Sequence, residues 1–99
     1  MPNSWSKNFG HLILTQRKKH QLPLRKVAAA LDIDTSTLSK IEKGERAANS
    51  KMIHPVAQLF GLDFKELQIS YLKQTLGDNY GKEPFFNEVL ILLVKESKI

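Results

Sequence analysis

The chain contains no cysteine among its 99 residues. A disulfide framework and a thiolate metal site are therefore excluded, and the composition fits a reducing compartment. Glycine and proline are also scarce, at 5 and 4 residues. Since 41% of the residues are hydrophobic and 25% are charged, the composition is that of one small globular domain and not of a disordered chain.

A long apolar run and a targeting segment are missing as well. The longest apolar run, Val89 to Val94, covers six residues, whereas a membrane-spanning helix needs about 20. The first residues, MPNSWSKNFGHLIL, lack the basic flank, apolar stretch and small-residue cleavage site of a signal peptide. We therefore expect a cytoplasmic protein with no membrane association.

The sequence offers no pattern for catalysis or metal binding. His11, His20 and His54 are scattered without the spacing of metal ligands, so no metal site is predicted. No carboxylates cluster with a histidine, and no glycine-rich phosphate loop occurs. Neither an enzyme nor a site for a cofactor or small-molecule ligand is expected.

Positive charge is concentrated in one half of the chain. The formal net charge is +5; residues 1–50 hold nine Lys and Arg against four Asp and Glu, and residues 51–99 hold six against six. This asymmetry is typical of a module that binds a polyanion joined to a module for assembly. A basic half that only aids solubility would show the same asymmetry, so charge alone leaves both interpretations open.

The spacing of apolar residues predicts helices along most of the chain. Phe9, Leu12 and Ile13 follow a helical period and indicate a first helix over residues 9–19. Pro23 marks the start of a second helix over residues 24–31, because proline is accepted in a first turn.

Two further helices are predicted in the second half of the chain. Residues 53–60 have the period of an amphipathic helix, although Pro55 requires a late start or a bent first turn. Asp63 caps a helix that we expect to stop near Gly77-Asp78-Asn79.

One more helix is predicted between the helix over residues 24–31 and the helix over residues 53–60. Asp34 is a suitable N-cap for a helix from Thr35 to about Lys43, and Gly44 closes it as a left-handed cap. Only about three residues separate it from the second helix, which is the spacing of a helix-turn-helix.

The last segment, PFFNEVLILLVKESKI, is apolar on almost every face. Such a short run fits either a strand or a helix. The spacing of Phe86, Val89, Leu90 and Leu93 favours a helix.

Residues 27–46, which read VAAALDIDTSTLSKIEKGER, resemble the Xre/Cro family of phage and bacterial repressors. The family pattern over this stretch is L-A-x3-G-V-S-x3-I-S-x-I-E-x-G-x-R. The resemblance extends over about residues 9–67 and says little about the remainder. It implies an all-α fold, in which residues 1–67 form a five-helix repressor-like helix-turn-helix domain and residues 68–99 form a C-terminal helical extension for dimerisation.

The resemblance implies that the third helix enters the major groove of double-stranded DNA. The base-reading positions of the family correspond to Thr35, Ser36 and Lys40, with Thr37 and Ser39 close by. An ammonium group can donate to guanine, a threonine methyl can pack on thymine, and hydroxyls can bond to base edges or phosphates. Alternatively, these hydroxyls only solvate the start of a helix.

Basic residues around the second and third helices are candidates for phosphate contacts. They are Lys18, Lys19, Arg25, Lys26, Lys43 and Arg46. Some of them are expected to form only a solvated basic face.

The family pattern also implies one structural ion pair. In the family, the glutamate at the position of Glu42 commonly pairs with an arginine of the first helix, and Arg17 occupies the position of that arginine.

The chain departs from the family pattern at three positions: Asp32 replaces the turn glycine, Leu24 replaces a phosphate-binding polar residue, and Ala48 replaces a frequent proline. Aspartate is tolerable in a left-handed conformation, whereas Leu24 removes one backbone contact.

A single helix-turn-helix binds weakly, and two copies related by a two-fold axis can engage half-sites about 34 Å apart. The apolar residues expected at the dimer interface are Phe85, Phe86, Val89, Leu90, Leu92, Leu93 and Val94. The alternative is that the last helix folds back onto the first and fifth helices of its own chain. The sequence thus predicts a homodimeric transcriptional regulator that binds a palindromic operator and can regulate its own gene. The competing prediction is an antitoxin or coactivator-like adaptor that binds a foreign protein.

Overall fold

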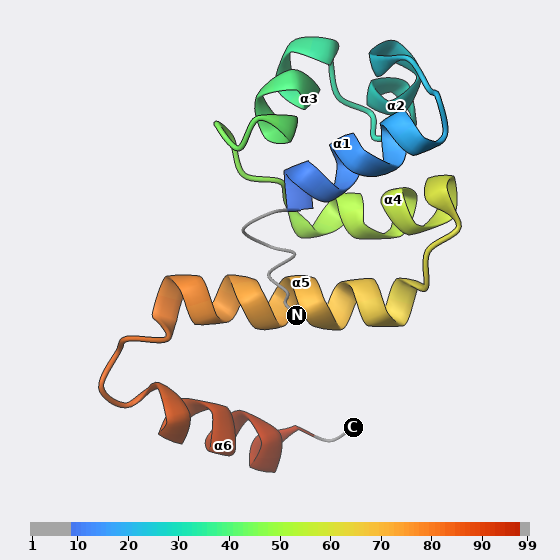
Figure 1. Cartoon of the computed structure of the whole chain (residues 1–99). Helices are drawn as coiled ribbons and strands as arrows, with labels where there is room; N and C mark the ends of the chain where they lie inside the picture. The colour runs from blue at the N-terminus through green and yellow to red at the C-terminus, as the bar shows by residue number, and fades with distance from the viewer. Residues whose placement is uncertain (1–8, 98–99) are drawn as a thin grey trace.

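The computed structural model describes residues 9–97. In this range the chain forms six α-helices and one 3-10 turn without any strand, which confirms the all-α prediction. The elements are α1 Phe9–Lys19, α2 Leu24–Ala30, α3 Thr35–Glu42, η1 Ser50–Met52, α4 Ile53–Phe60, α5 Phe64–Tyr80 and α6 Phe86–Glu96. Figure 1 shows α2 and α3 at one end of the molecule, α1, α4 and α5 across its middle, and α6 at the other end.

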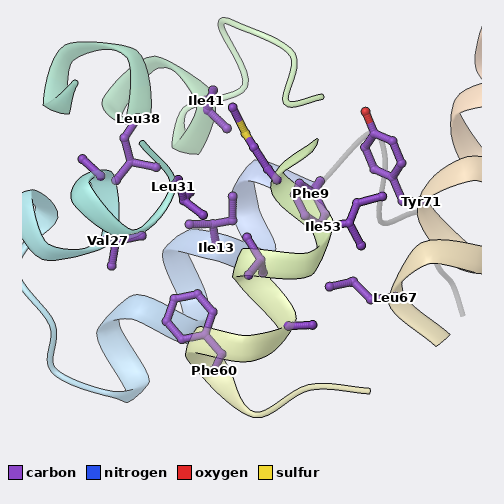
Figure 2. Packing of buried hydrophobic residues seen from close by; sticks show 14 residues of the cluster. Phe9, Ile13, Val27, Leu31, Leu38, Ile41, Ile53, Phe60, Leu67 and Tyr71 are labelled. Atoms are coloured by element: carbon purple, nitrogen blue, oxygen red, sulfur yellow. The ribbon is translucent and has the colours of Figure 1, made fainter. Parts of the chain in front are cut away.

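One hydrophobic core joins α1 to α5 (Figure 2). Phe9 and Ile13 of α1, Leu38 of α3, Ile53 of α4 and Leu67 of α5 are all fully buried. Each such side chain contributes about 1.5–3 kcal/mol relative to its exposed state. No residue of α6 is buried, so this helix adds nothing to the core.

The four helices α1 to α4 end with a residue in the left-handed conformation. Gln21, Asp32, Gly44 and Gly61 have φ angles of 55°, 58°, 79° and 67°. In each case the next amide donates to the carbonyl five positions earlier, with N–O distances of 2.8–3.0 Å. The left-handed conformations expected at Asp32 and Gly44 are confirmed. Gln21 carried no signal in the sequence, because glutamine has no preference for this conformation.

Pro55 and Gly77 both lie within helices. Pro55 is the third residue of α4, where its missing N–H has no intrahelical partner to lose. The helix α5 runs through Gly77 and ends at Tyr80, one residue beyond the stop expected near residues 77–79. A hydrogen bond of 3.0 Å from Gln74 Nε2 to Asp78 Oδ1 spans the glycine. The division drawn between residues 67 and 68 therefore falls inside a continuous helix.

The helices α1 and α3 approach each other closely at Gly10. A β-carbon at this position would collide with the backbone carbonyl of Ile41. Only glycine permits this distance between the two helices. The contact could not be predicted, since a glycine in an apolar helical pattern does not reveal what it touches.

A bidentate ion pair sets the position of α3 against α1. Arg17 Nε and Nη2 donate to the Glu42 carboxylate at 2.8 and 3.0 Å, and Nη1 donates to the Leu22 carbonyl at 3.2 Å. The two side chains are only 17% and 6% exposed. The hydrogen bond with Glu42 raises the pKa of Arg17 above its ordinary value, so the guanidinium stays charged. Two parallel charge-assisted bonds fix an angle as well as a distance.

Replacing Gly10 or Gly77 by alanine should change the free energy of unfolding in opposite directions. Gly10→Ala should lower the free energy of unfolding by about 1–3 kcal/mol, because α1 and α3 must separate. Gly77→Ala, for which no atom lies within 4 Å of the added methyl group, should raise it by up to about 1 kcal/mol through helix propensity. Urea unfolding followed by circular dichroism measures both, and equal effects would contradict the close packing.

The ion pair predicts that loss of one partner costs more than replacement of both. Glu42→Ala should destabilise the protein by about 2–3 kcal/mol. The charged guanidinium of Arg17, which is mostly shielded from water, then loses its partner, and the remaining solvent contact offsets only part of this cost. The double variant Arg17→Met/Glu42→Leu should lie within about 1 kcal/mol of the unmodified protein. Urea midpoints of the three variants test this, and an unchanged midpoint for Glu42→Ala would show that the pair does not stabilise the fold.

Candidate nucleic-acid interface

The start of α3 is fixed by its own cap. Asp34 Oδ1 accepts a hydrogen bond of 2.7 Å from the Thr37 amide. The backbone and side-chain hydrogen bonds from Thr37, together with the charges of Arg46 and Lys40, lower the pKa of Asp34 below its ordinary value. The cap is therefore ionised at neutral pH, and α3 has a defined first turn before any ligand arrives.

The two sides of α3 differ in character. Leu38 and Ile41 are buried in the core, whereas Thr35, Ser36 and Lys40 are exposed. Thr37 and Ser39 are half-buried at the edges of the outer face. The structure thus brings Thr35, Ser36 and Lys40 together on one exposed face of a helix, with hydroxyl groups in its first turn and an ammonium group one turn later.

The predicted phosphate contacts lie in three places, and all are exposed. Lys18 and Lys19 end α1, Arg25 and Lys26 lie in the first turn of α2, and Lys43 and Arg46 flank the turn at Gly44. Among them, only Arg46 is tied to the start of α3, through its charge acting on Asp34.

The loop that carries Arg46 is held from α5. The hydroxyl of Tyr71 donates to the Ala48 carbonyl at 3.0 Å, and its ring meets Phe9 edge to face at 5.3 Å. Beside this bond, the loop, the start of α1 and the end of α5 line an open depression of about 620 Å³. Tyr71 was not predicted to support this loop. Its spacing from Leu67 predicts burial, but the bond to the loop is a tertiary contact without a local signal.

The composition of the described side chains limits which ligands they can hold. Between residues 9 and 97 no three His, Cys, Asp or Glu side chains come together to hold a metal ion. None of the helices in that range has the length and apolar character needed to cross a bilayer. What the exposed face of α3 offers is hydrogen-bond donors and positive charge.

Comparison with known proteins gives one match. A helix-turn-helix family model matches residues 13–67, a segment that contains α2 and α3 and ends in the first turn of α5. Searches of curated proteins and of solved structures found no match. Because the matched segment is more than half of the chain and includes the capped, exposed α3, the chain belongs to the Xre/Cro-type helix-turn-helix family of DNA-binding domains.

Proposed function

We propose that the protein is a sequence-specific transcriptional regulator that binds a palindromic operator as a dimer. The observation that carries this proposal is the exposed face of α3, whose position is fixed by the Arg17–Glu42 pair and whose start is fixed by Asp34. A rigid helix with exposed donors can enter a major groove without reorganisation. Such a regulator acts where DNA is, which is the basis for the cytoplasmic location.

Base reading is assigned to three exposed residues of α3. Lys40 donates to O6 or N7 of guanine, and Thr35 and Ser36 contact base edges or the thymine methyl group. Thr37 and Ser39 lie at the edges of this face and adjust its fit. Leu24 has no polar group for the phosphate at the start of α2, so the neighbouring exposed Arg25 and Lys26 take that contact.

The remaining cations bind phosphates and orient the domain. Arg46 is the best placed, because its loop follows α3 directly and is held by Tyr71. Contacts of this kind raise affinity for any sequence and make binding depend on salt. As part of the same proposal, the operator lies upstream of the regulator's own gene, so the protein is autoregulatory.

A second candidate function is a protein interaction module, such as an antitoxin or adaptor. It is favoured by the apolar side chains of α6, which are exposed from Val89 to Val94. In this case α6 binds a foreign protein. Light scattering separates the two functions, because a stable dimer supports the regulator and a monomer supports the adaptor.

Selection from a random-sequence DNA library tests the regulator directly. Sequences retained by the protein should converge on an inverted repeat with half-site centres about 34 Å apart, one helical turn of DNA. If repeated rounds enrich no inverted repeat, the proposed function is wrong.

Lys40→Ala predicts a change confined to one base pair of each half-site. Affinity for the selected operator should fall by about 1–3 kcal/mol per contact, and the preference at that base pair should relax. Fluorescence anisotropy on single-substitution operators measures this, with Lys82→Ala, an exposed lysine after α5, as the control. Equal weakening on all sequences would reduce Lys40 to a phosphate contact.

Arg46→Gln predicts a change in salt dependence without a change in base preference. The slope of log affinity against log salt should become shallower by about 0.9 for each protomer, because one phosphate contact is lost. Lys82→Ala should leave the slope unchanged. Titrations at four salt concentrations decide this, and an unaltered slope for Arg46→Gln would remove Arg46 from the interface.

A further inference from the structure

Apolar side chains surround almost the whole of α6. At 100° per residue they cover roughly 260° of its circumference, where a helix packed on one neighbour needs little more than 100°. The apolar side chains from Val89 to Val94 are between 37% and 76% exposed. The polar strip consists mainly of Glu88 and Lys95, which lie two turns apart on one line. Such a helix needs neighbours on two sides.

The helix α5 carries an exposed apolar stripe in addition to its buried side. Ile69, Leu72, Leu76 and Tyr80 follow one another at intervals of three and four residues and are 40–54% exposed. By helical spacing they lie opposite the residues through which α5 packs on the core. One side of α5 therefore belongs to the helix-turn-helix domain, and the other side faces away from it.

The chain folds α6 back along this stripe without closing the space between the two helices. The rings of Tyr80 and Phe86 lie with their centroids 6.4 Å apart, next to the connection between α5 and α6. Beyond them an open apolar groove of about 470 Å³ is lined by Leu76 on one side and by Val89, Leu90 and Leu93 on the other. Figure 1 shows α6 beneath α5 at the end of the molecule remote from α3.

We propose that the α5–α6 hairpins of two copies pack into an antiparallel four-helix bundle, in which α6 of each copy fills the groove of the other. This proposal rests on the proposed function for its dimer and adds which helices form it and in which direction they run. The bundle covers the stripe of α5 and both sides of α6 at once. It also accounts for the groove, which a single copy leaves open.

The apolar area is that of an interface between two proteins. The large apolar side chains of α6 and the α5 stripe together expose on the order of 900 Å² per copy, given about 150–220 Å² for each when fully exposed. A standard interface buries about 800 Å² per partner. A patch of this size on a monomer would promote aggregation.

The charge pattern identifies the occupant as a second copy and sets its direction. An antiparallel pair of α6 helices centred near Ile91 places Glu88 of one copy near Lys95 of the other, and the two-fold axis repeats the contact. The surface is thus complementary to itself. Residues 51–99 also hold equal numbers of acidic and basic residues, so two such halves do not repel each other.

Sedimentation equilibrium of the full chain tests the bundle. Ile91→Asp and Leu76→Asp should each raise the dimer dissociation constant at least about 100-fold, because a charge would enter an apolar interface. Gln58→Asp, which adds the same charge to the exposed side of α4, should leave it unchanged. None of the three residues is buried, so circular dichroism should show the same helix content. An unmodified chain that sediments as a monomer at 100 µM overturns the proposal.

Exchange of the two charges tests the direction. Glu88→Lys and Lys95→Glu should each weaken self-association about tenfold, since like charges then meet twice in every dimer. An equimolar mixture of the two single variants should restore dimerisation, as should the double variant. If the mixture associates no better than either variant alone, α6 is not paired in the antiparallel direction.

A half-site duplex separates this proposal from the proposed function. Ile91→Asp should bind one half-site with the same base preference as the unmodified protein, because α3 is untouched. If the unmodified chain is a monomer and still reads a half-site, the bundle is rejected and the DNA-reading function is retained. A stable dimer that prefers no sequence would retain the bundle and reject the function.

Discussion

The bidentate bond between Arg17 and Glu42 is the contact on which the DNA-facing surface depends. Hydrophobic packing of Leu38 and Ile41 holds α3 on the core but allows it to rotate, because apolar contact has no direction. The guanidinium removes that freedom, since its planar fork accepts a carboxylate in one orientation. Its third donor reaches the Leu22 carbonyl, so the turn between α1 and α2 is aligned with α3 by the same side chain.

Local patterns predicted the helices well, because each end carried a residue with a physical preference. Asp34 and Asp63 cap helix starts through their carboxylates, and Gly44 and Gly61 supply left-handed ends. Gln21 has no such preference, so the left-handed end of α1 carried no local signal. Glycine is a poor helix former, yet α5 continues through Gly77, where the bond from Gln74 to Asp78 spans it.

The candidate site was predicted in part for a related reason. Spacing placed Leu38 and Ile41 on the inner face of α3, whereas Thr35, Ser36 and Lys40 were expected together because the resemblance to the repressor family implied it. The supporting contacts could not be foreseen, because Gly10 against Ile41 and Tyr71 against Ala48 join residues far apart in the chain. The residues of the stripe on α5 recur in the sequence at intervals of three and four. The buried residues of the same helix recur at similar intervals, so the sequence alone did not separate the two sides.

Tyr71 and the exposed apolar stripe lie on the same helix, so α5 connects the stripe with the helix-turn-helix domain. Its ring and hydroxyl hold the start of α1 and the loop that carries Arg46, and the opposite side of the same helix bears the exposed stripe. Any molecule that covers the stripe favours conformations in which α5 is fully formed, and those conformations also hold the loop in place. By thermodynamic linkage, occupancy at one end of the molecule and DNA affinity at the other must change together. In the proposed dimer, α5 would therefore make the DNA affinity of each helix-turn-helix domain depend on protein concentration, separately from any gain due to bivalent binding.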